Sequence, residues 1–324
     1  MKVKNIREIW NKGLIFFKPS SANYWHLVTP CFITQKPEIP GRYYLDFTSK
    51  AEYPQNLDSN GIPLFRYFKG NDALYHPIAI SQYALGLFDR LHQLKFDSEE
   101  IKMKFLRQAD WLIENRQEYG KVKCWYFNHQ NPRYKVKAPY CSSMAQGEGI
   151  SVLCRAYILT ADEKYLNVAE ESLLPFEKSV EDGGVVNKFK NMLLYEECPA
   201  LKITGILNGY IFSLFGLFDL SLIRANSKAK NLFDIGIENI SMLLKWYDLG
   251  YWSRYDLYEF PLINPASFTY HNIHIEQLKA LFIITGKDIF REYSIKWSEQ
   301  NLRFKNRVLA LTKKMIYLRK IKSV

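Results

Sequence analysis

Proton-carrying side chains gather in the stretch DLYEFPLINPASFTYHNIH, which spans residues 256–274 and follows directly on Tyr255. Tyrosine donates a proton readily and can accept one when neighbouring charges ionise it, since its reference pKa is about 10. Tyr270 is therefore a candidate acid or base. His271 and His274 lie three residues apart, but no HExxH or other ligand pattern accompanies them. We therefore expect no metal site here. The alternative to a functional role is that these histidines are structural residues near the start of a helix.

A second group of candidate residues lies in LLYEECPALKITGILNGY, where Glu196 and Glu197 end an extended apolar segment. A carboxyl group at the mouth of a cleft can have its pKa raised by desolvation and then act as an acid or a base. The alternative is an acidic residue that only stabilises the start of the following helix.

A third stretch, YCSSMAQGEGISVLCRAY, predicts a helix that begins at one of two adjacent serines. Gln146 and Glu148 lie in its first turns and could bind a hydroxyl group. Gly147 and Gly149 each cost about 1 kcal/mol relative to alanine in a helix. Either a bound sugar or a closely packed neighbouring helix would explain them, and the sequence does not choose between the two.

The elements that must position these residues repeat along the chain. Segments with helical spacing occur in pairs from residue 77 onward, and the pairs recur about every 60 to 70 residues. An aromatic residue marks the first helix of each pair: Phe88, Tyr157, Phe218 and Phe282. We predict a mainly α fold, an incomplete α/α barrel or toroid of about four helix pairs with short β hairpins. Its cleft would be lined by the N-termini of the inner helices and by the extended connectors between pairs.

The first part of the chain has a different composition. Proline, glycine and aromatic residues are frequent there, which is typical of loops and short strands. We expect a small β- and loop-rich region over residues 1–72, with one helix near Ile6–Phe17. Residues 73–324 would form the barrel domain with a basic tail.

Composition limits the classes of partner and compartment. The chain has 324 residues and a formal net charge of +11. Several basic residues lie near the C-terminus, and such a tail can contact an anionic membrane surface or a polyanion, or can form a solvated helix face. The five cysteines are scattered without a CxxC pair, which favours reduced thiols. The apolar run GLIFF is too short for a signal peptide, so we expect a soluble cytoplasmic protein.

Three blocks together resemble the C-terminal catalytic domain of the D-glucuronyl C5-epimerases, enzymes of heparan sulfate and heparosan modification. They are SSMAQGEGISVLCRAYILT, YEECPALKITGILNGYIFSLFGLFDL, and YDL followed by SFTYHNIHIEQLKAL, in the family's order. The resemblance covers roughly residues 75–300. It implies a β region packed on an α/α barrel and inversion of carbon 5 of glucuronate, within a polysaccharide, to give iduronate. It implies no redox cofactor.

The resemblance also implies roles for particular residues. In the family the acid–base work belongs to a glutamate in an E-E-Y-P motif and to tyrosines in Y-D-L and D-Y-H motifs. These match Glu197, Tyr255 and Tyr270 here. We expect Glu197 and Tyr270 to be opposed proton carriers, and Tyr255 to hydrogen-bond the substrate carboxylate or the developing charge. Six further residues are expected to contact substrate: Gln146, Glu148, Cys198, Asn208, Arg254 and His271.

Three positions depart from the family pattern. Cys198 stands where the tyrosine follows the catalytic glutamate, Thr269 replaces the aspartate before Tyr270, and Tyr258 replaces the arginine after Y-D-L. A lost arginine removes one partner for a sulfate or carboxylate group. We therefore expect a glucuronate-containing glycan other than heparosan, such as a capsule or exopolysaccharide.

The preferred hypothesis is a polysaccharide uronate C5-epimerase that needs neither a metal nor a cofactor. The alternatives are a glycan lyase or glycoside hydrolase on a uronate-containing polysaccharide, since α/α toroids host both, or an inactive glycan-binding homologue. The expected partner is an acidic polysaccharide and not nucleic acid. Peripheral contact with a membrane through the basic tail, and a homodimer, are both compatible with the sequence.

Overall fold

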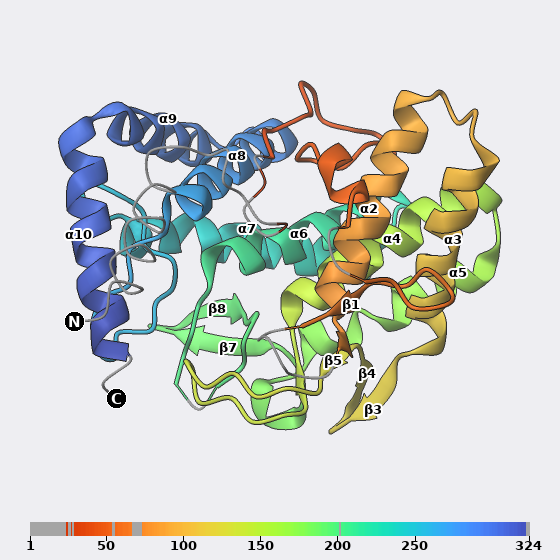
Figure 1. Ribbon diagram of the computed structural model, residues 1–324, viewed down its shortest axis with the longest axis horizontal. Helices are drawn as coiled ribbons and strands as arrows, with labels where there is room; N and C mark the ends of the chain where they lie inside the picture. The colour runs from red at the N-terminus through yellow and green to blue at the C-terminus, as the bar shows by residue number, and fades with distance from the viewer. Residues whose placement is uncertain are drawn as a thin grey trace.

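The computed structural model describes most of the chain, namely residues 24, 27, 29–53, 56–66, 73–200 and 202–321. This part is mainly α-helical, with short two-stranded hairpins between the helices (Figure 1). The predicted fold class is therefore confirmed. The helix expected near residues 6–17 lies outside the described residues.

Four consecutive helix pairs form the body of the described structure, as the repeat predicts, and the two helices of each pair pack together. The first helices of the pairs also pack in succession, α2 on α4, α4 on α6 and α6 on α8. This arc fits an incomplete α/α toroid. The pairs are α2 (Pro77–Gln93) with α3 (Glu99–Glu114), α4 (Ser143–Thr160) with α5 (Glu163–Glu171), α6 (Leu207–Leu222) with α7 (Ser227–Tyr247), and α8 (Phe268–Thr285) with α9 (Asp288–Leu302).

Side-chain caps fix where several helices begin. The hydroxyl of Ser98 accepts from the amide of Ile101 at the start of α3, and Ser142 does the same for α4. Ser267 caps α8 through the amide of Tyr270. These caps set the register in which the first-turn residues of each helix face the interior.

Helices α4 and α6 cross unusually closely because glycines lie at the contact. A Cβ atom on Gly147 would stand 2.4 Å from the Cα of Ser213, and one on Gly216 would stand 2.0 Å from the carbonyl oxygen of Gly147. Gly149 faces the ring of Trp125 in the same way, at 2.5 Å. Protein packing therefore accounts for both glycines in the first turns of α4, so no bound sugar is needed to explain them.

Four antiparallel strand pairs lie before α2 or in the connectors between helix pairs, and several of them lie on the same side of the arc (Figure 1). Their strands are β1 (Leu64–Phe65) with β2 (Leu74–Tyr75), β3 (Gln117–Tyr119) with β4 (Val122–Cys124), β5 (Tyr126–Phe127) with β6 (Tyr140–Cys141), and β7 (Val186–Phe189) with β8 (Met192–Tyr195). Three short 3-10 helices accompany them: η3 (Thr48–Ala51), η4 (Leu174–Glu177) and η5 (Val180–Asp182).

The connector between α7 and α8 differs from the expected extended segment. It forms only two isolated bridges, Asp248 with Ser253 and Arg254 with Pro265. Proline has no amide hydrogen to donate, so Pro261 and Pro265 limit a regular ladder here.

The N-terminal region packs directly on the helices. The amides of Tyr43 and Phe47 donate to the buried carboxylate of Asp89 in α2, at 2.8 and 2.9 Å. The hydroxyl of Tyr44 donates to Asp219 in α6 at 2.6 Å. The segment GRYYLDF forms one isolated bridge, from Leu45 to Cys31, and no regular strand. The proposed division at residue 72 therefore separates two parts that share one core.

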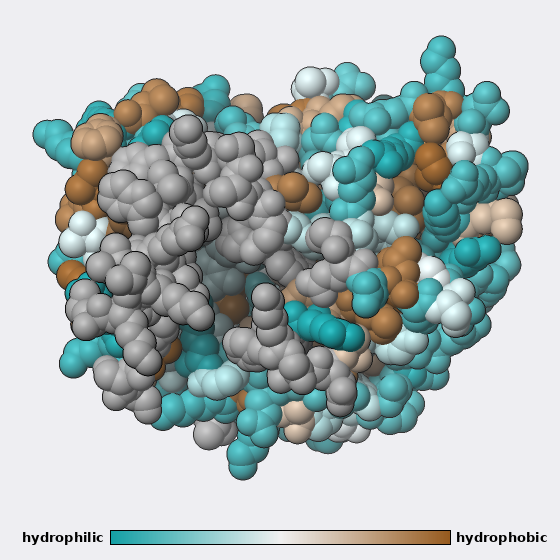
Figure 2. All heavy atoms as spheres, viewed as in Figure 1, coloured by the Kyte–Doolittle hydropathy of each residue, from teal (hydrophilic) through white to brown (hydrophobic). Residues whose placement is uncertain are grey.

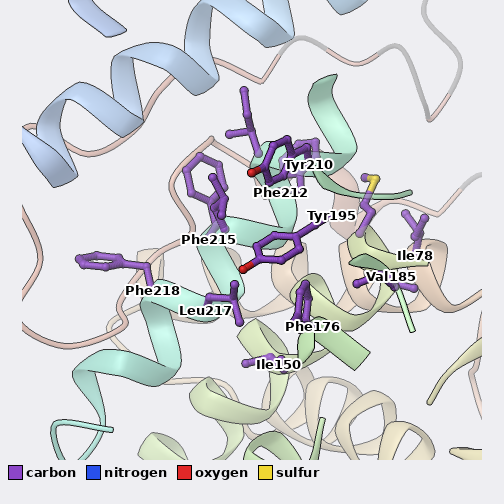
Figure 3. Close-up of a cluster of buried hydrophobic side chains, with 14 of the residues drawn as sticks. Ile78, Ile150, Phe176, Val185, Tyr195, Tyr210, Phe212, Phe215, Leu217 and Phe218 are labelled. Atoms are coloured by element: carbon purple, nitrogen blue, oxygen red, sulfur yellow. The ribbon is translucent and has the colours of Figure 1, made fainter. Parts of the chain in front are cut away.

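A cluster of aromatic side chains fills the space between α6 and the β7–β8 hairpin. Figure 3 shows the ring of Tyr195 between Phe176 and Tyr210, and ring centroids lie 5.1 and 5.5 Å from it, both edge to face. The hydroxyl of Tyr195 donates to the carbonyl oxygen of Leu232. This anchoring fixes the last residue of β8, immediately before the adjacent glutamates.

The basic tail forms a further helix, α10 (Phe304–Ile321), which packs on α9. Ala310 and Tyr317 are buried, and the ammonium of Lys314 donates to the carbonyl oxygen of Pro265 and to the side chain of Asn264. Exposed apolar residues gather over α9 and α10 at one edge of the face in Figure 2. None of the helices in the described part is long and apolar enough to cross a membrane.

Candidate active site

A cavity of about 300 Å³ opens where the first turns of the inner helices converge. Helices α2, α4, α6 and α8 each contribute a wall, and the connectors before α4 and α6 complete it. This is the expected placement of the cleft. The N-terminal region supplies wall residues as well, among them Lys50 of η3.

The cavity brings together two of the three predicted acid–base residues. Glu197 comes from the connector after β8, and Tyr270 comes from the first turn of α8. The two residues are 73 positions apart in the sequence, yet both side chains line the same cavity. The charge of Glu197 also raises the pKa of Tyr270.

Local structure aims Glu197 at the cavity. Its neighbour Glu196 is fully buried and accepts hydrogen bonds from the amides of Thr204 and Gly205, at 3.1 and 2.9 Å. Glu196 therefore stabilises the turn before α6. The adjacent side chain of Glu197 lies against the first turn of α6, because Gly209 has no side chain there.

The environment of Glu197 shifts its ionisation toward neutral pH. Burial raises the pKa of this carboxyl to about 8, the charges of Glu196 and Asp256 add to the rise, and the guanidinium of Arg133 opposes it. The Oε2 atom is buried and accepts no hydrogen bond from the described residues. A carboxyl group poised in this range can donate or accept a proton at neutral pH.

Tyr255 supports Tyr270 from behind the cavity wall. Their rings lie edge to face with centroids 4.8 Å apart. Burial raises the pKa of Tyr270 to about 12, and a hydrogen bond from Tyr255 opposes this rise. Tyr255 therefore stabilises the ionised form of Tyr270, although Tyr255 itself does not line the cavity.

A polar network holds Tyr255 in place through the next residue in the chain. The buried carboxylate of Asp256 accepts three hydrogen bonds. The donors are the guanidinium of Arg133 at 2.9 Å, the hydroxyl of Tyr134 at 2.7 Å and the side-chain amide of Asn264 at 2.6 Å. The guanidinium of Arg133 also lies 5.1 Å from the centroid of the Tyr255 ring. Arg133 thus places a positive charge beside the acid–base residues.

Four oxygens in side chains of the cavity wall have no hydrogen-bond partner in the described part of the protein: Glu197 Oε2, Asn208 Oδ1, Gln82 Oε1 and the hydroxyl oxygen of Thr29. Buried acceptors without donors are costly, about 1–3 kcal/mol each. A ligand that presents several hydroxyl groups would satisfy them, which favours a carbohydrate over an apolar ligand.

The cavity also contains a buried lysine. Lys50 is 4% exposed, and its ammonium donates to the carbonyl oxygen of Tyr24 at 2.5 Å. Among the wall residues that the structure describes, Lys50 is the one lysine or arginine. Burial lowers the pKa of Lys50 to about 7, and the charge of Glu148 opposes this shift. An anionic group that binds beside Lys50 would favour its charged form.

The remaining predicted residues divide into two groups. Cys198 and Asn208 line the cavity, and burial raises the pKa of the Cys198 thiol, so the thiol stays protonated. Gln146, Glu148, Arg254 and His271 do not line it. Their predicted contacts with substrate stay predictions, but their side chains have other partners.

Those partners belong to the protein. Gln146 donates to the carbonyl of Trp125 and accepts from its amide, and Glu148 accepts from Gln82 at 3.0 Å. Arg254 donates to the carbonyl of Asp256.

His271 is fully buried and stacks on Trp252, with ring centroids 3.6 Å apart. Its Nδ1 accepts from the amide of Ser253 at 3.2 Å, so Nε2 carries the hydrogen and donates to the carbonyl of Trp297 at 3.1 Å. Both nitrogens are therefore occupied by structural bonds.

Sequence reasoning missed several wall residues, notably His76, His129 and Asn131. His129 and Asn131 follow β5 in a connector, which is the kind of segment where the repeat placed the chemistry. Their polar types in the run NHQN were the signal available. No such signal marked Lys50, because only tertiary packing brings η3 against α2.

Metal-binding residues do not cluster in the described ranges: no group of three or more His, Cys, Asp or Glu side chains there is placed to hold a metal ion. Burial lowers the pKa of His76 to about 3 and that of His129 to about 4. Both imidazoles are neutral at physiological pH and can act as hydrogen-bond partners for a neutral ligand.

Comparison with known proteins links this geometry to a family. Residues 117–299 match the family model described as D-glucuronyl C5-epimerase C-terminus. The chain is 34% identical over 215 residues to the D-glucuronyl C5-epimerase of Caenorhabditis elegans. The aligned region covers 61% of this chain and 35% of the worm protein. It is 30% identical over 239 residues to an uncharacterized protein of Methanocaldococcus jannaschii. That aligned region covers 69% of this chain and 76% of the archaeal protein. The chain thus spans about a third of the length of the worm protein.

Proposed function

This chain belongs to the D-glucuronyl C5-epimerase family, and from that premise we propose that it inverts carbon 5 of glucuronate units in an acidic polysaccharide. The observation that carries the proposal is the meeting of Glu197 and Tyr270 at one cavity. Each is half-buried, each carries a transferable proton, and their pKa values are raised to about 8 and about 12.

The reaction needs a base on one face of the sugar ring and an acid on the other. One of the pair Glu197 and Tyr270 removes the proton from carbon 5, and the electron pair of the C–H bond moves into the carboxylate to give an enolate-like intermediate. The other residue then delivers a proton to the opposite face, and the configuration is inverted. No other bond breaks, so the same two groups serve the reverse reaction with their protonation states exchanged.

The developing negative charge requires stabilisation within the cavity. Lys50 lines the cavity and would bind the substrate carboxylate, and Arg133 adds positive potential near Glu197. Tyr255 donates to Tyr270 and so lowers the cost of its phenolate. The four side-chain oxygens without partners would bind hydroxyl groups of the sugar.

The test is deuterium exchange at carbon 5. A glucuronate-containing oligosaccharide incubated with the protein in deuterated water should gain deuterium at carbon 5, and iduronate should appear in its NMR spectrum. Glu197→Gln and Tyr270→Phe should each reduce exchange by at least about 100-fold. Tyr258→Phe is the matched control, because Tyr258 is buried in the same connector and does not line the cavity.

The same experiment separates the alternatives. A lyase would expel the substituent at carbon 4 after the same proton abstraction, and unsaturated products that absorb ultraviolet light would then replace iduronate. An inactive binding protein would bind the glycan in the parent and in both variants without any exchange.

A further inference from the structure

Helix α10 packs on the rest of the protein through one face. Ala310 and Tyr317, two turns apart on that face, are fully buried. The ammonium of Lys314 donates to the side chain of Asn264 at 2.7 Å and to the carbonyl oxygen of Pro265 at 3.0 Å. These contacts fix the rotation of the helix about its axis. A defined opposite face is therefore exposed, at the left edge of the molecule in Figure 1.

Large apolar side chains lie on this exposed face and at the corner that precedes it. Leu302 and Phe304 are 78% and 69% exposed, the two highest values among the exposed large apolar residues of the described part. Val308, Leu309 and Ile316 are also exposed, and at 100° per residue they lie within about 100° of one another around the helix axis. Exposed apolar side chains gathered in one place mark an interaction surface. We call these five residues, with the cations between them, the α10 surface.

The cations of the α10 surface have no acidic counterpart in the helix. The exposed cations are Arg303, Lys305, Lys313, Arg319 and Lys320. Residues 300–321 include neither Asp nor Glu. On other helices an exposed lysine pairs with an acid one turn away, as Lys104 does with Glu100 in α3 and Lys230 with Asp234 in α7. No pair of this kind can form within α10, so the helix presents a positive face.

Apolar and basic side chains on one surface favour one class of partner. In a symmetric dimer of this chain the α10 surface would meet itself, and its like charges would repel each other. A free polyanion would neutralise the cations but would leave the apolar side chains in water. The surface of a bilayer with anionic lipids accepts both, because phosphate groups lie directly above the ends of the acyl chains.

We propose that the α10 surface docks the protein on a membrane that contains anionic phospholipids, with the helix parallel to the membrane plane. The apolar side chains enter the boundary between headgroups and acyl chains, and the cations contact the lipid phosphates. This docking concerns attachment and not the reaction, so it does not depend on the proposed function.

Flotation of the full chain with vesicles measures the docking. One vesicle preparation contains phosphatidylcholine alone, and the other contains phosphatidylcholine mixed with phosphatidylglycerol. The parent should bind the anionic vesicles at least about tenfold more tightly, because its cations attract the charged surface. High salt should remove this preference, since it screens exposed charges.

Two double variants separate the charged and the apolar contributions. Lys305→Gln with Lys313→Gln should weaken binding to anionic vesicles about 20-fold, because each cation near such a surface contributes about fivefold. Leu302→Ser with Leu309→Ser should weaken the same binding at least about tenfold, because less apolar surface is buried.

Matched controls lie at exposed positions outside α9 and α10. Lys36→Gln with Lys123→Gln, and Ile39→Ser, should leave vesicle binding unchanged. All of these side chains are exposed, so thermal unfolding of every variant should match that of the parent.

Equal binding to both vesicle preparations, no binding to either, or an equal loss in the controls would overturn the proposal. A loss in the lysine variant with none in the leucine variant would assign the surface to a soluble polyanion and would overturn docking as well. Analytical ultracentrifugation without vesicles tests the remaining partner. A dimer of the parent that dissociates in the leucine variant would assign the α10 surface to a second copy of the chain and not to a membrane.

Discussion

The carboxyl group of Glu197 lies directly against the backbone of Gly209: a Cβ atom built on Gly209 would stand 2.1 Å from Oε2 of Glu197. Gly209 is the third residue of α6, and its φ is not among the positive values of the chain. Helix geometry therefore does not require glycine here. The space that the carboxyl group occupies does.

Gly209→Ala should consequently displace the Glu197 side chain without unfolding α6. Because a shift of about 1 Å in a reacting group costs about 100-fold in rate, we expect a loss of C5 exchange of that order. Gly41→Ala is the matched control, since no atom lies within 4 Å of a Cβ at that position. Full activity in Gly209→Ala would mean that the position of Glu197 is not needed for the reaction.

The raised pKa of Glu197 predicts a pH-dependent stability cost. The folded-state pKa is about 8 against an ordinary value of 4.5, so the unfolded chain releases this proton first. Stability is fully retained below about pH 4.5 and is lost progressively as the pH rises through about 8. Glu197→Gln removes the ionisation and should stabilise the protein at pH 9 by about 2 kcal/mol, since the residue keeps some exposure.

Urea denaturation of parent and Glu197→Gln at pH 5 and pH 9 measures this difference. The gain should be small at pH 5 and largest at pH 9. A gain that does not grow with pH would show that Glu197 ionises at an ordinary pKa in the folded protein.

Replacement of Lys50 should separate activity from stability. The pKa of Lys50 is lowered from 10.5 to about 7, so the parent loses stability as the pH falls from about 10.5 through 7. Lys50→Met removes this cost, and thermal unfolding at pH 7 should occur at the same or a higher temperature. Exchange at carbon 5 should fall at least about 100-fold, because the substrate carboxylate loses its cation.

Lys36→Met, a change at an exposed lysine, should leave both properties unaltered. Lys50→Met with normal exchange and a normal KM would contradict the assignment of Lys50 to the substrate carboxylate.

The packing of the N-terminal region predicts that residues 73–324 do not fold alone. Removal of the preceding residues would take away Tyr43, Tyr44 and Phe47 from the core and leave Asp89 and Asp219 without these partners. Each buried acceptor that loses its donor costs about 1–3 kcal/mol. Circular dichroism and urea denaturation of the fragment should show no cooperative unfolding.

Tyr44→Phe in the full chain tests the same packing with a smaller change, because it removes only the hydrogen bond from the Tyr44 hydroxyl to Asp219. It should cost about 1–2 kcal/mol, because Asp219 keeps its bonds to Ser151 and Arg155. A fragment of residues 73–324 that unfolds cooperatively would instead make the division at residue 72 a true domain boundary.

The sequence by itself determined the helix pairs, because the apolar periodicity and the capping residues of a helix are local. It also predicted, from a resemblance in its motifs, a site that contains Glu197, Cys198, Asn208 and Tyr270, and all four line the cavity. The sequence did not determine which side chains in the first turn of α8 point into the cavity. Tyr270 and His271 are adjacent, yet successive helical residues point about 100° apart. Tyr270 faces the cavity, and His271 stacks on Trp252 in the core.

Only the tertiary structure decided which distant segments meet. Gln146 and Glu148 bond other protein groups, and Gly147 is needed for the crossing of α4 and α6. Lys50 reaches the cavity because η3 packs on α2, a contact between residues that no local pattern connects. Such contacts depend on the summed packing of many side chains, and no short stretch of sequence contains that information.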